Sequence, residues 1–81
     1  MTEMVWVVTA GERDEGGTVA GIFTTQRKAQ TFADTVVVAK RCIFPRTHKN
    51  WTSWEKISTC VWERVSPEGV DWARVEKWHI E

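Results

Sequence analysis

The sequence predicts an α+β domain: an antiparallel sheet of about four strands, arranged as two hairpins, with one amphipathic helix packed on one face. Two observations lead to this prediction. Strand-forming segments flank glycine- or proline-containing turns in both halves of the chain, and an apolar pattern with helical spacing lies between them. A chain of 81 residues is expected to form a single small domain, residues 1–81.

The first hairpin is predicted near the N-terminus. Residues 4–9 are rich in strand formers and apolar throughout, which suits a strand buried on both faces better than an edge strand. The polar stretch 11–17 contains three glycines and predicts the turn, and residues 18–23 predict the returning strand. Gly21 inside this second strand indicates a bulge or a close backbone approach.

The helix is predicted to start at Gln26, after a threonine pair that offers an N-cap hydroxyl. Three successive valines weaken its helix propensity, so it is expected to end near Ala39 or Lys40. Its apolar positions recur every three or four residues and form one stripe: Ala29, Phe32, Ala33, Val36 and Val37.

The second hairpin is predicted near the C-terminus, with residues 59–65 as its first strand. Ser66-Pro67-Glu68-Gly69 has the proline and glycine positions of a type I turn. The return strand starts at Val70, and pairing Val65 with Val70 sets the register, although a slip of one residue would exchange the two faces. The expected register places four side chains on one face: Cys60, Trp62, Ala73 and Val75.

Six tryptophans and no tyrosine are the most unusual feature of the composition. Each indole can bury roughly 150–250 Å², so most of them are expected in the core and one to three at the surface. Trp6 and Trp62 are assigned to the core. The positions of Trp72 and Trp78 depend on which face of the sheet the last strand presents.

Residues 40–57 show no regular pattern and are predicted to be mostly loop. The chain has no net charge, but residues 40–56 hold five basic residues against Glu55 alone. Tryptophan and arginine are enriched at binding hot spots, so this stretch predicts an exposed binding surface, with a merely solvated loop as the alternative. The predicted partner-binding residues are Arg41, Arg46, Lys49, Trp51, Trp54 and Lys56.

Catalytic and metal-binding chemistry is not indicated, and we expect no enzymatic activity, catalytic residue, metal or cofactor. No apolar run is long enough to span a membrane, and the first ten residues lack a charged lead. The expected location is therefore the cytoplasm. The candidate metal ligands and nucleophiles are Cys42, His48, Cys60 and His79. None of them forms a C-x2-C or H-x3-H pair.

Three short motifs resemble a family of small phage and prophage proteins of unknown function. They are VWVVTAGE at 5–12, VAGIFTT at 19–25 and the pair Lys28-Ala29. They match a V-x-V-V-T-x-G-E strand, a V-x-G-[VI]-F-[ST]-T strand and a helix that opens with K-A. The resemblance covers residues 4–33 and implies an order of elements and a viral origin, hence the host cytoplasm. Residues 40–56 depart from the family pattern.

The expected function is therefore that of a non-enzymatic, phage-type protein that binds a host or viral protein. Two alternatives remain open. The first is binding of single-stranded nucleic acid through Trp51, Trp54 and the flanking lysine and arginine residues. The second is self-association, with the tryptophans in a homodimer interface.

Overall fold

The computed structural model describes residues 3–13, 16–38, 51–66 and 69–80. These residues form five strands and one helical segment that changes from α to π geometry. The elements are β1 (Glu3–Glu12), β2 (Thr18–Phe23), α1 (Gln26–Phe32), η1 (Ala33–Val38), β3 (Glu55–Ser58), β4 (Val61–Val65) and β5 (Asp71–Ile80).

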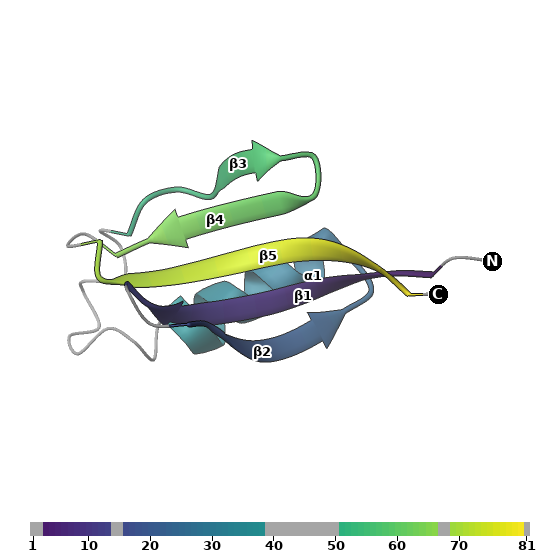
Figure 1. Cartoon of the computed structure of the whole chain (residues 1–81), viewed down its shortest axis with the longest axis horizontal. Helices are drawn as coiled ribbons and strands as arrows, with labels where there is room; N and C mark the ends of the chain where they lie inside the picture. The colour runs from purple at the N-terminus through teal and green to yellow at the C-terminus, as the bar shows by residue number, and fades with distance from the viewer. Residues whose placement is uncertain (1–2, 14–15, 39–50, 67–68, 81) are drawn as a thin grey trace.

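The strands form one antiparallel sheet in the order β2-β1-β5-β4-β3. The helical segment crosses one face and packs against β2, β1 and β5 (Figure 1). We call this face the helix side and the opposite one the open face. The expected α+β architecture, an antiparallel sheet with a helix on one face, is confirmed, and β1 is a central strand as its apolar sequence predicts.

The described residues contain one strand more than expected. β3 lies in the segment predicted to be mostly loop and pairs with β4, Lys56 opposite Trp62. All four residues of β3 are exposed. A strand without a buried face needs no alternating apolar side chains, so its sequence carries no signal with a period of two.

The first hairpin follows its prediction closely. Val8 pairs with Gly21 but Thr9 pairs with Val19, so Ala20 is an extra residue in β2. A Cβ atom on Gly21 would lie 2.8 Å from the Phe23 ring. The expected bulge is therefore present beside Gly21, whereas the group in close approach is an aromatic side chain and not backbone.

The helix begins as predicted but turns differently near its end. The Thr25 hydroxyl accepts a hydrogen bond from the Lys28 amide at 3.2 Å. In η1, the backbone hydrogen bonds join residues five apart instead of four apart. The apolar stripe therefore rotates around the helix axis. Val38 is fully buried, whereas Val36, which was assigned to the stripe, is only half-buried.

The second hairpin turns at the predicted position but has a different register; Pro67 and Glu68, which define the turn type, lie outside the described residues. The Gly69 amide donates to the Ser66 carbonyl at 2.9 Å, as in a β-turn, and Gly69 has a φ of 71°. Pairing resumes only at Asp71, so Val65 lies opposite Trp72 instead of Val70. The shift is two residues, which leaves Trp62, Ala73 and Val75 on the face that was predicted, whereas Cys60 lies in the turn before β4.

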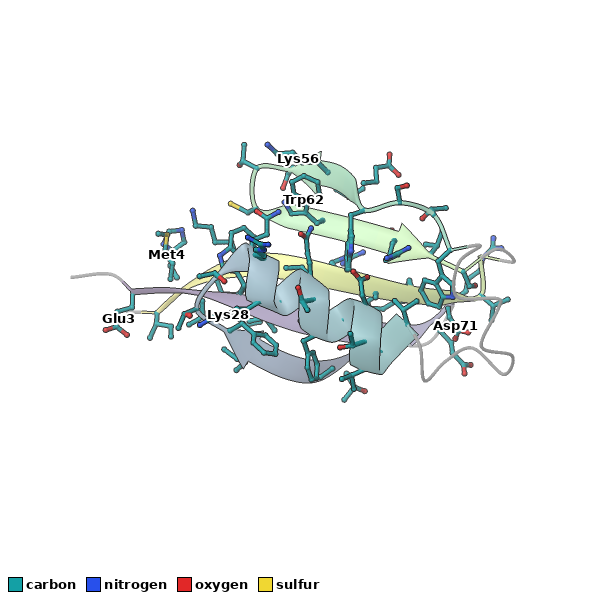
Figure 2. The ribbon with its side chains drawn as sticks, turned by 180° about the vertical axis from the view of Figure 1, so that it is seen from behind. Glu3, Met4, Lys28, Lys56, Trp62 and Asp71 are labelled. Atoms are coloured by element: carbon teal, nitrogen blue, oxygen red, sulfur yellow. The ribbon has the colours of Figure 1, made fainter. Side chains whose placement is uncertain are left out.

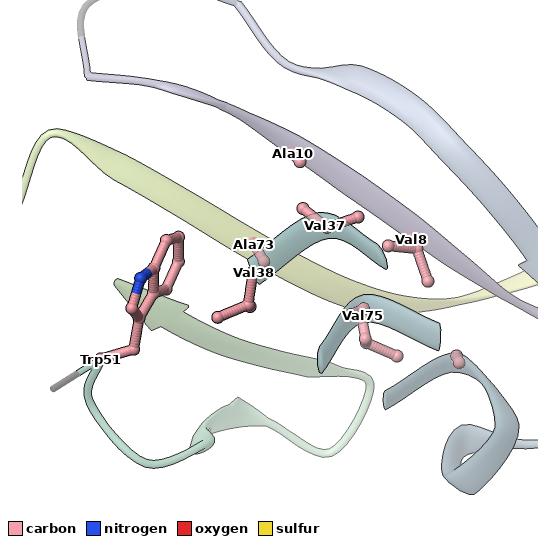
Figure 3. Packing of buried hydrophobic residues seen from close by; sticks show 9 residues of the cluster. Val8, Ala10, Val37, Val38, Trp51, Ala73 and Val75 are labelled. Atoms are coloured by element: carbon pink, nitrogen blue, oxygen red, sulfur yellow. The ribbon is translucent and has the colours of Figure 1, made fainter. Parts of the chain in front are cut away.

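The core lies between the helix and the sheet (Figure 3). Val8 and Ala10 of β1 meet Ala73 and Val75 of β5 there, under the small and branched residues of the helix. Trp51 belongs to the same cluster, is only 5% exposed and appears at one end of it in Figure 3. The core is thus closed by a residue from the segment predicted to be an exposed loop.

On the open face, Trp72 lies flat against glycines of the first hairpin. A Cβ atom on Gly11 would lie 2.8 Å from the Trp72 ring, and one on Gly17 would overlap the same ring. The indole N–H donates to the Glu12 carbonyl at 3.3 Å. Glycine is required at these two positions because backbone and indole are in direct contact.

Gly17→Ala is expected to lower the free energy of unfolding by about 1–2 kcal/mol, because the new methyl group displaces Trp72. Gly16→Ala is a matched control, since a Cβ atom at Gly16 meets nothing within 4 Å, and it should be neutral or slightly stabilising. Urea denaturation of the two variants measures the difference. Equal stabilities would contradict the packing of Trp72 on Gly17.

Candidate functional site

Only half of the predicted partner-binding residues lie in the part of the chain that the structure describes. Arg41, Arg46 and Lys49 lie outside it. Trp51, expected to be exposed, is instead buried, so that expectation is wrong. Trp51 is buried because its neighbour Thr52 is fixed on β4. The Thr52 amide donates to the Val65 carbonyl and the Thr52 hydroxyl accepts from the Val65 amide, both at 3.0 Å, and these bonds direct the Trp51 side chain into the core.

Trp54 is half-buried and already has partners within the chain. Its indole N–H donates to Asp34 of η1 at 3.1 Å, and the Arg64 guanidinium lies 5.5 Å from its ring centroid. Arg64 also donates to Asp34 at 2.6 Å. These three residues join the helical segment to β4, so the main role of Trp54 in this structure is to bridge the two layers.

Lys56 belongs to a row of alternating lysines and tryptophans on the helix side. Its ammonium lies 5.8 Å from the ring centroid of Trp62, the residue opposite it on β4. Lys77 of β5 likewise lies 5.9 Å from the ring centroid of Trp6, opposite it on β1. Trp62 is opposite Val75, so Lys77 is its diagonal neighbour on the same face.

We call these four residues, Trp6, Lys77, Trp62 and Lys56, the lysine–tryptophan surface. The helix packs on β2, β1 and β5, so the β4–β3 end of the surface extends beyond it (Figure 2). Trp6 and Trp62 are half-buried, with their inner parts against the core. Within the described residues neither lysine has an ion pair. Both ammonium groups are therefore available to an external anion.

The zero net charge of the chain hides two oppositely charged faces. Pairing and side-chain alternation assign the charged residues of the sheet to one side or the other. Arg13 follows the end of β1, and the remaining described helix side holds five cations and three acids: Arg27, Lys28, Lys56, Arg64, Lys77, Asp34, Glu12 and Asp71. The open face holds four acids and one cation: Glu3, Glu55, Glu63, Glu76 and Arg74.

Arg74 contacts three other side chains on the open face. It donates to Glu63 at 2.7 and 3.0 Å, lies 3.5 Å from Glu76 and stacks at 5.2 Å on the Trp72 ring. The hydrogen bond with Glu63 raises the pKa of Arg74 above its ordinary value, so the guanidinium stays charged. Trp78, the only one of the six tryptophans that is exposed, at 52%, donates to Glu76 at 3.3 Å. The sequence did not decide which face of the sheet Trp72 and Trp78 occupy, and both lie on the open face.

The sequence pattern pointed to one part of this site and missed the rest. Lys56 was found because it ends the basic stretch. Trp6, Trp62 and Lys77 come from three different strands, and only strand order brings them together. The available signal was the alternation along β5, where Lys77 shares a face with the buried Ala73 and Val75.

Three observations concern metal binding, the cysteine thiols and membrane spans. Among the described residues, no three His, Cys, Asp or Glu side chains gather to hold a metal ion. Cys60 has a free, half-buried thiol, while Cys42 and His48 lie outside the described ranges. In the same ranges, no helix is long and apolar enough to cross a membrane.

Comparison with known proteins gave no matching family model, no matching curated protein and no matching solved structure. The fold itself defines the chain as a small α+β domain. The resemblance to a phage family stays a prediction that rests on the motifs of residues 4–33.

Proposed function

We propose that this protein is a non-enzymatic binding protein that docks an acidic host or viral protein through the lysine–tryptophan surface. The observation that supports this most strongly is the row Trp6–Lys77–Trp62–Lys56. It combines aromatic area with two ammonium groups that have no ion pair among the described residues, on the cationic side of the domain. Aromatic anchors with surrounding charge are typical of protein-binding surfaces.

Structural stabilisation alone accounts for only part of this arrangement. A cation over an exposed indole contributes about 0.5–1 kcal/mol when it lies within about 6 Å of the ring centroid. Both lysines lie close to that limit, at 5.8 and 5.9 Å. Their ammonium hydrogens stay free to bind carboxylates, which makes the surface complementary to an acidic partner.

A protein partner is favoured over single-stranded nucleic acid because of where the indoles lie. Stacking on bases requires an accessible ring face. Trp51 is buried, and Arg64 lies over the ring of Trp54 while Asp34 accepts its N–H. The four glutamates of the open face would also repel a long polyanion that wraps around the domain.

Affinity capture from a host lysate tests the proposal with two variants of equal charge. Lys56→Gln/Lys77→Gln and Arg27→Gln/Lys28→Gln each remove two positive charges from the helix side. We expect the Lys56/Lys77 variant to lose the proteins that dock on the lysine–tryptophan surface, with binding weakened about tenfold, and the Arg27/Lys28 variant to retain those proteins. The interaction should also weaken at high salt, because surface charges are then screened.

Two results would count against this proposal. Retention of the same proteins by the Lys56/Lys77 variant, shown to be folded by circular dichroism, would exclude the lysine–tryptophan surface as the docking site. A band shift of a single-stranded oligonucleotide at low salt, lost in that variant, would replace the protein partner by nucleic acid. Light scattering of the pure protein distinguishes the homodimer alternative, since a monomer at high concentration removes it.

A further inference from the structure

A concave surface lies between the helix and β2. It is an open groove of about 420 Å³, and six residues line it: Phe23, Arg27, Lys28, Thr31, Phe32 and Thr35. Its apolar part is the pair Phe23 and Phe32, whose ring centroids are 4.9 Å apart with the planes inclined at 43°. The volume is sufficient for one or two apolar side chains of a ligand.

Two cations stand on the exposed first turn of α1 and line the same groove. Neither Arg27 nor Lys28 forms an ion pair with any described residue. The first turn of α1 contains no acidic residue, although acidic side chains are the ones that stabilise the start of a helix. Helix stability therefore does not explain the choice of two cations here, whereas attraction of an anionic ligand does.

The groove adjoins an edge of the sheet that pairs with no further strand among the described residues. β2 is the terminal strand in the order β2-β1-β5-β4-β3, and most of its residues are exposed, including Val19 at 54% and Ile22 at 62%. An edge strand offers unpaired backbone groups to an added strand, while alternate side chains of that strand reach the pockets beside it. Phe23 is both the last residue of β2 and part of the groove, so the edge and the groove are continuous.

The bulge at Ala20 limits where an added strand fits. Bulges commonly protect sheet edges because they twist the strand and interrupt the pairing. This one lies in the middle of β2, and the segment from Gly21 to Phe23 follows it without a further shift in register. That segment is also the part of β2 nearest the groove, so the unprotected stretch of the edge is the one beside Phe23.

We propose that the groove and the Gly21–Phe23 edge bind an extended acidic peptide of a protein partner. An apolar side chain of the peptide packs on Phe23 and Phe32, adjacent carboxylates meet Arg27 and Lys28, and its backbone pairs with β2. Phe23 of this site pairs with Trp6 of the lysine–tryptophan surface, but the cations of the two sites are different, and this proposal does not depend on that surface being functional.

Selection from a displayed library of random peptides tests the proposal directly. The enriched peptides should carry Asp or Glu next to an aromatic or aliphatic residue. Arg27→Gln/Lys28→Gln should weaken their binding about tenfold, which corresponds to the loss of two surface ion pairs. Lys56→Gln/Lys77→Gln is the matched control with the same change in charge and should bind the selected peptides as wild type does.

Two further measurements locate the peptide. Thr31→Phe fills the groove from an exposed helix position and should abolish binding without unfolding the domain. Backbone amides of β2 should exchange with solvent more slowly when a selected peptide is bound. Selection of peptides without acidic residues, unchanged binding by Thr31→Phe, or protection of β3 instead of β2 would overturn the proposal. Concentration-dependent protection of β2 in the pure protein would also overturn it, because the occupant would then be a second copy of this chain.

Discussion

Trp51→Ala is expected to lower the free energy of unfolding by about 3–5 kcal/mol, the usual range for removing a large aromatic side chain from a core. The indole is 5% exposed and belongs to the cluster that holds helix and sheet together. A chain of 81 residues typically has a stability of roughly 4–12 kcal/mol. This one substitution should therefore remove much of the stability of the domain.

Trp78→Ala is the matched control for Trp51→Ala, because it deletes the same side chain from a site that is 52% exposed. Its expected effect is below about 1 kcal/mol. Urea denaturation followed by far-ultraviolet circular dichroism compares the two variants without relying on indole fluorescence. A smaller loss for Trp51→Ala than for Trp78→Ala would show that Trp51 is not a core residue in solution.

This expectation also bears on any binding experiment. A Trp51→Ala variant that fails to bind a partner would be uninformative, since loss of binding would follow from loss of structure. The lysines of the lysine–tryptophan surface are better targets, because Lys56 is exposed, Lys77 is half-buried and neither belongs to the core cluster. The structure thus changes which substitutions report on function.

Asp34→Ala is expected to destabilise the domain by about 2–3 kcal/mol. One carboxylate oxygen of Asp34 accepts from Arg64 at 2.6 Å and from Trp54 at 3.1 Å. The Arg64 side chain is only 16% exposed, and its Nε has no hydrogen-bond partner among the described residues. Removal of Asp34 leaves this partly buried guanidinium without its carboxylate, which costs more than the hydrogen bonds themselves contribute.

A double-mutant cycle separates the ion pair from other effects of the substitution. Arg64→Met removes the charge but keeps an apolar side chain beside Trp54, so Asp34→Ala in the Arg64→Met background should cost about 1 kcal/mol or less. Asp34→Asn keeps an oxygen acceptor for the Trp54 N–H and should cost less than Asp34→Ala. Strictly additive effects of Asp34→Ala and Arg64→Met would contradict the coupling, and chemical denaturation at constant ionic strength provides the measurement.

Cations lie over four of the six indoles, Trp6, Trp54, Trp62 and Trp72. Two of the contacts join paired strands, Arg64 contacts Trp54 ten residues before it, and Arg74 contacts Trp72 two residues before it on β5. They show how a small domain keeps so many large aromatic side chains at the boundary between core and surface: a charged group covers the outer part of each ring and remains hydrated. The lysines of such contacts keep free hydrogens, which connects the packing of the indoles with the proposed docking of an acidic partner.

Local patterns in the sequence were sufficient for most of the elements. The Thr25 cap, the glycine-marked bulge in β2 and the turn at Ser66 each depend on the conformational preference of one or two residues, and all three are present. The register of the second hairpin was wrong by two residues. The turn at Ser66 was predicted, but the two residues after Gly69, which precede the pairing of Trp72 with Val65, have no local signal.

The sequence by itself determined the α+β class, the order of the main elements and the excess of tryptophan, because these depend on composition and on periodicity over short distances. Only the tertiary structure decided which indoles are buried. Trp51 enters the core through the hydrogen bonds of Thr52 with a strand that begins ten residues later, and Trp78 faces solvent because β5 presents that side to the open face. The division of charge between the two faces has the same origin: alternation along each strand is local, but the side that the helix covers is settled only when the layers pack.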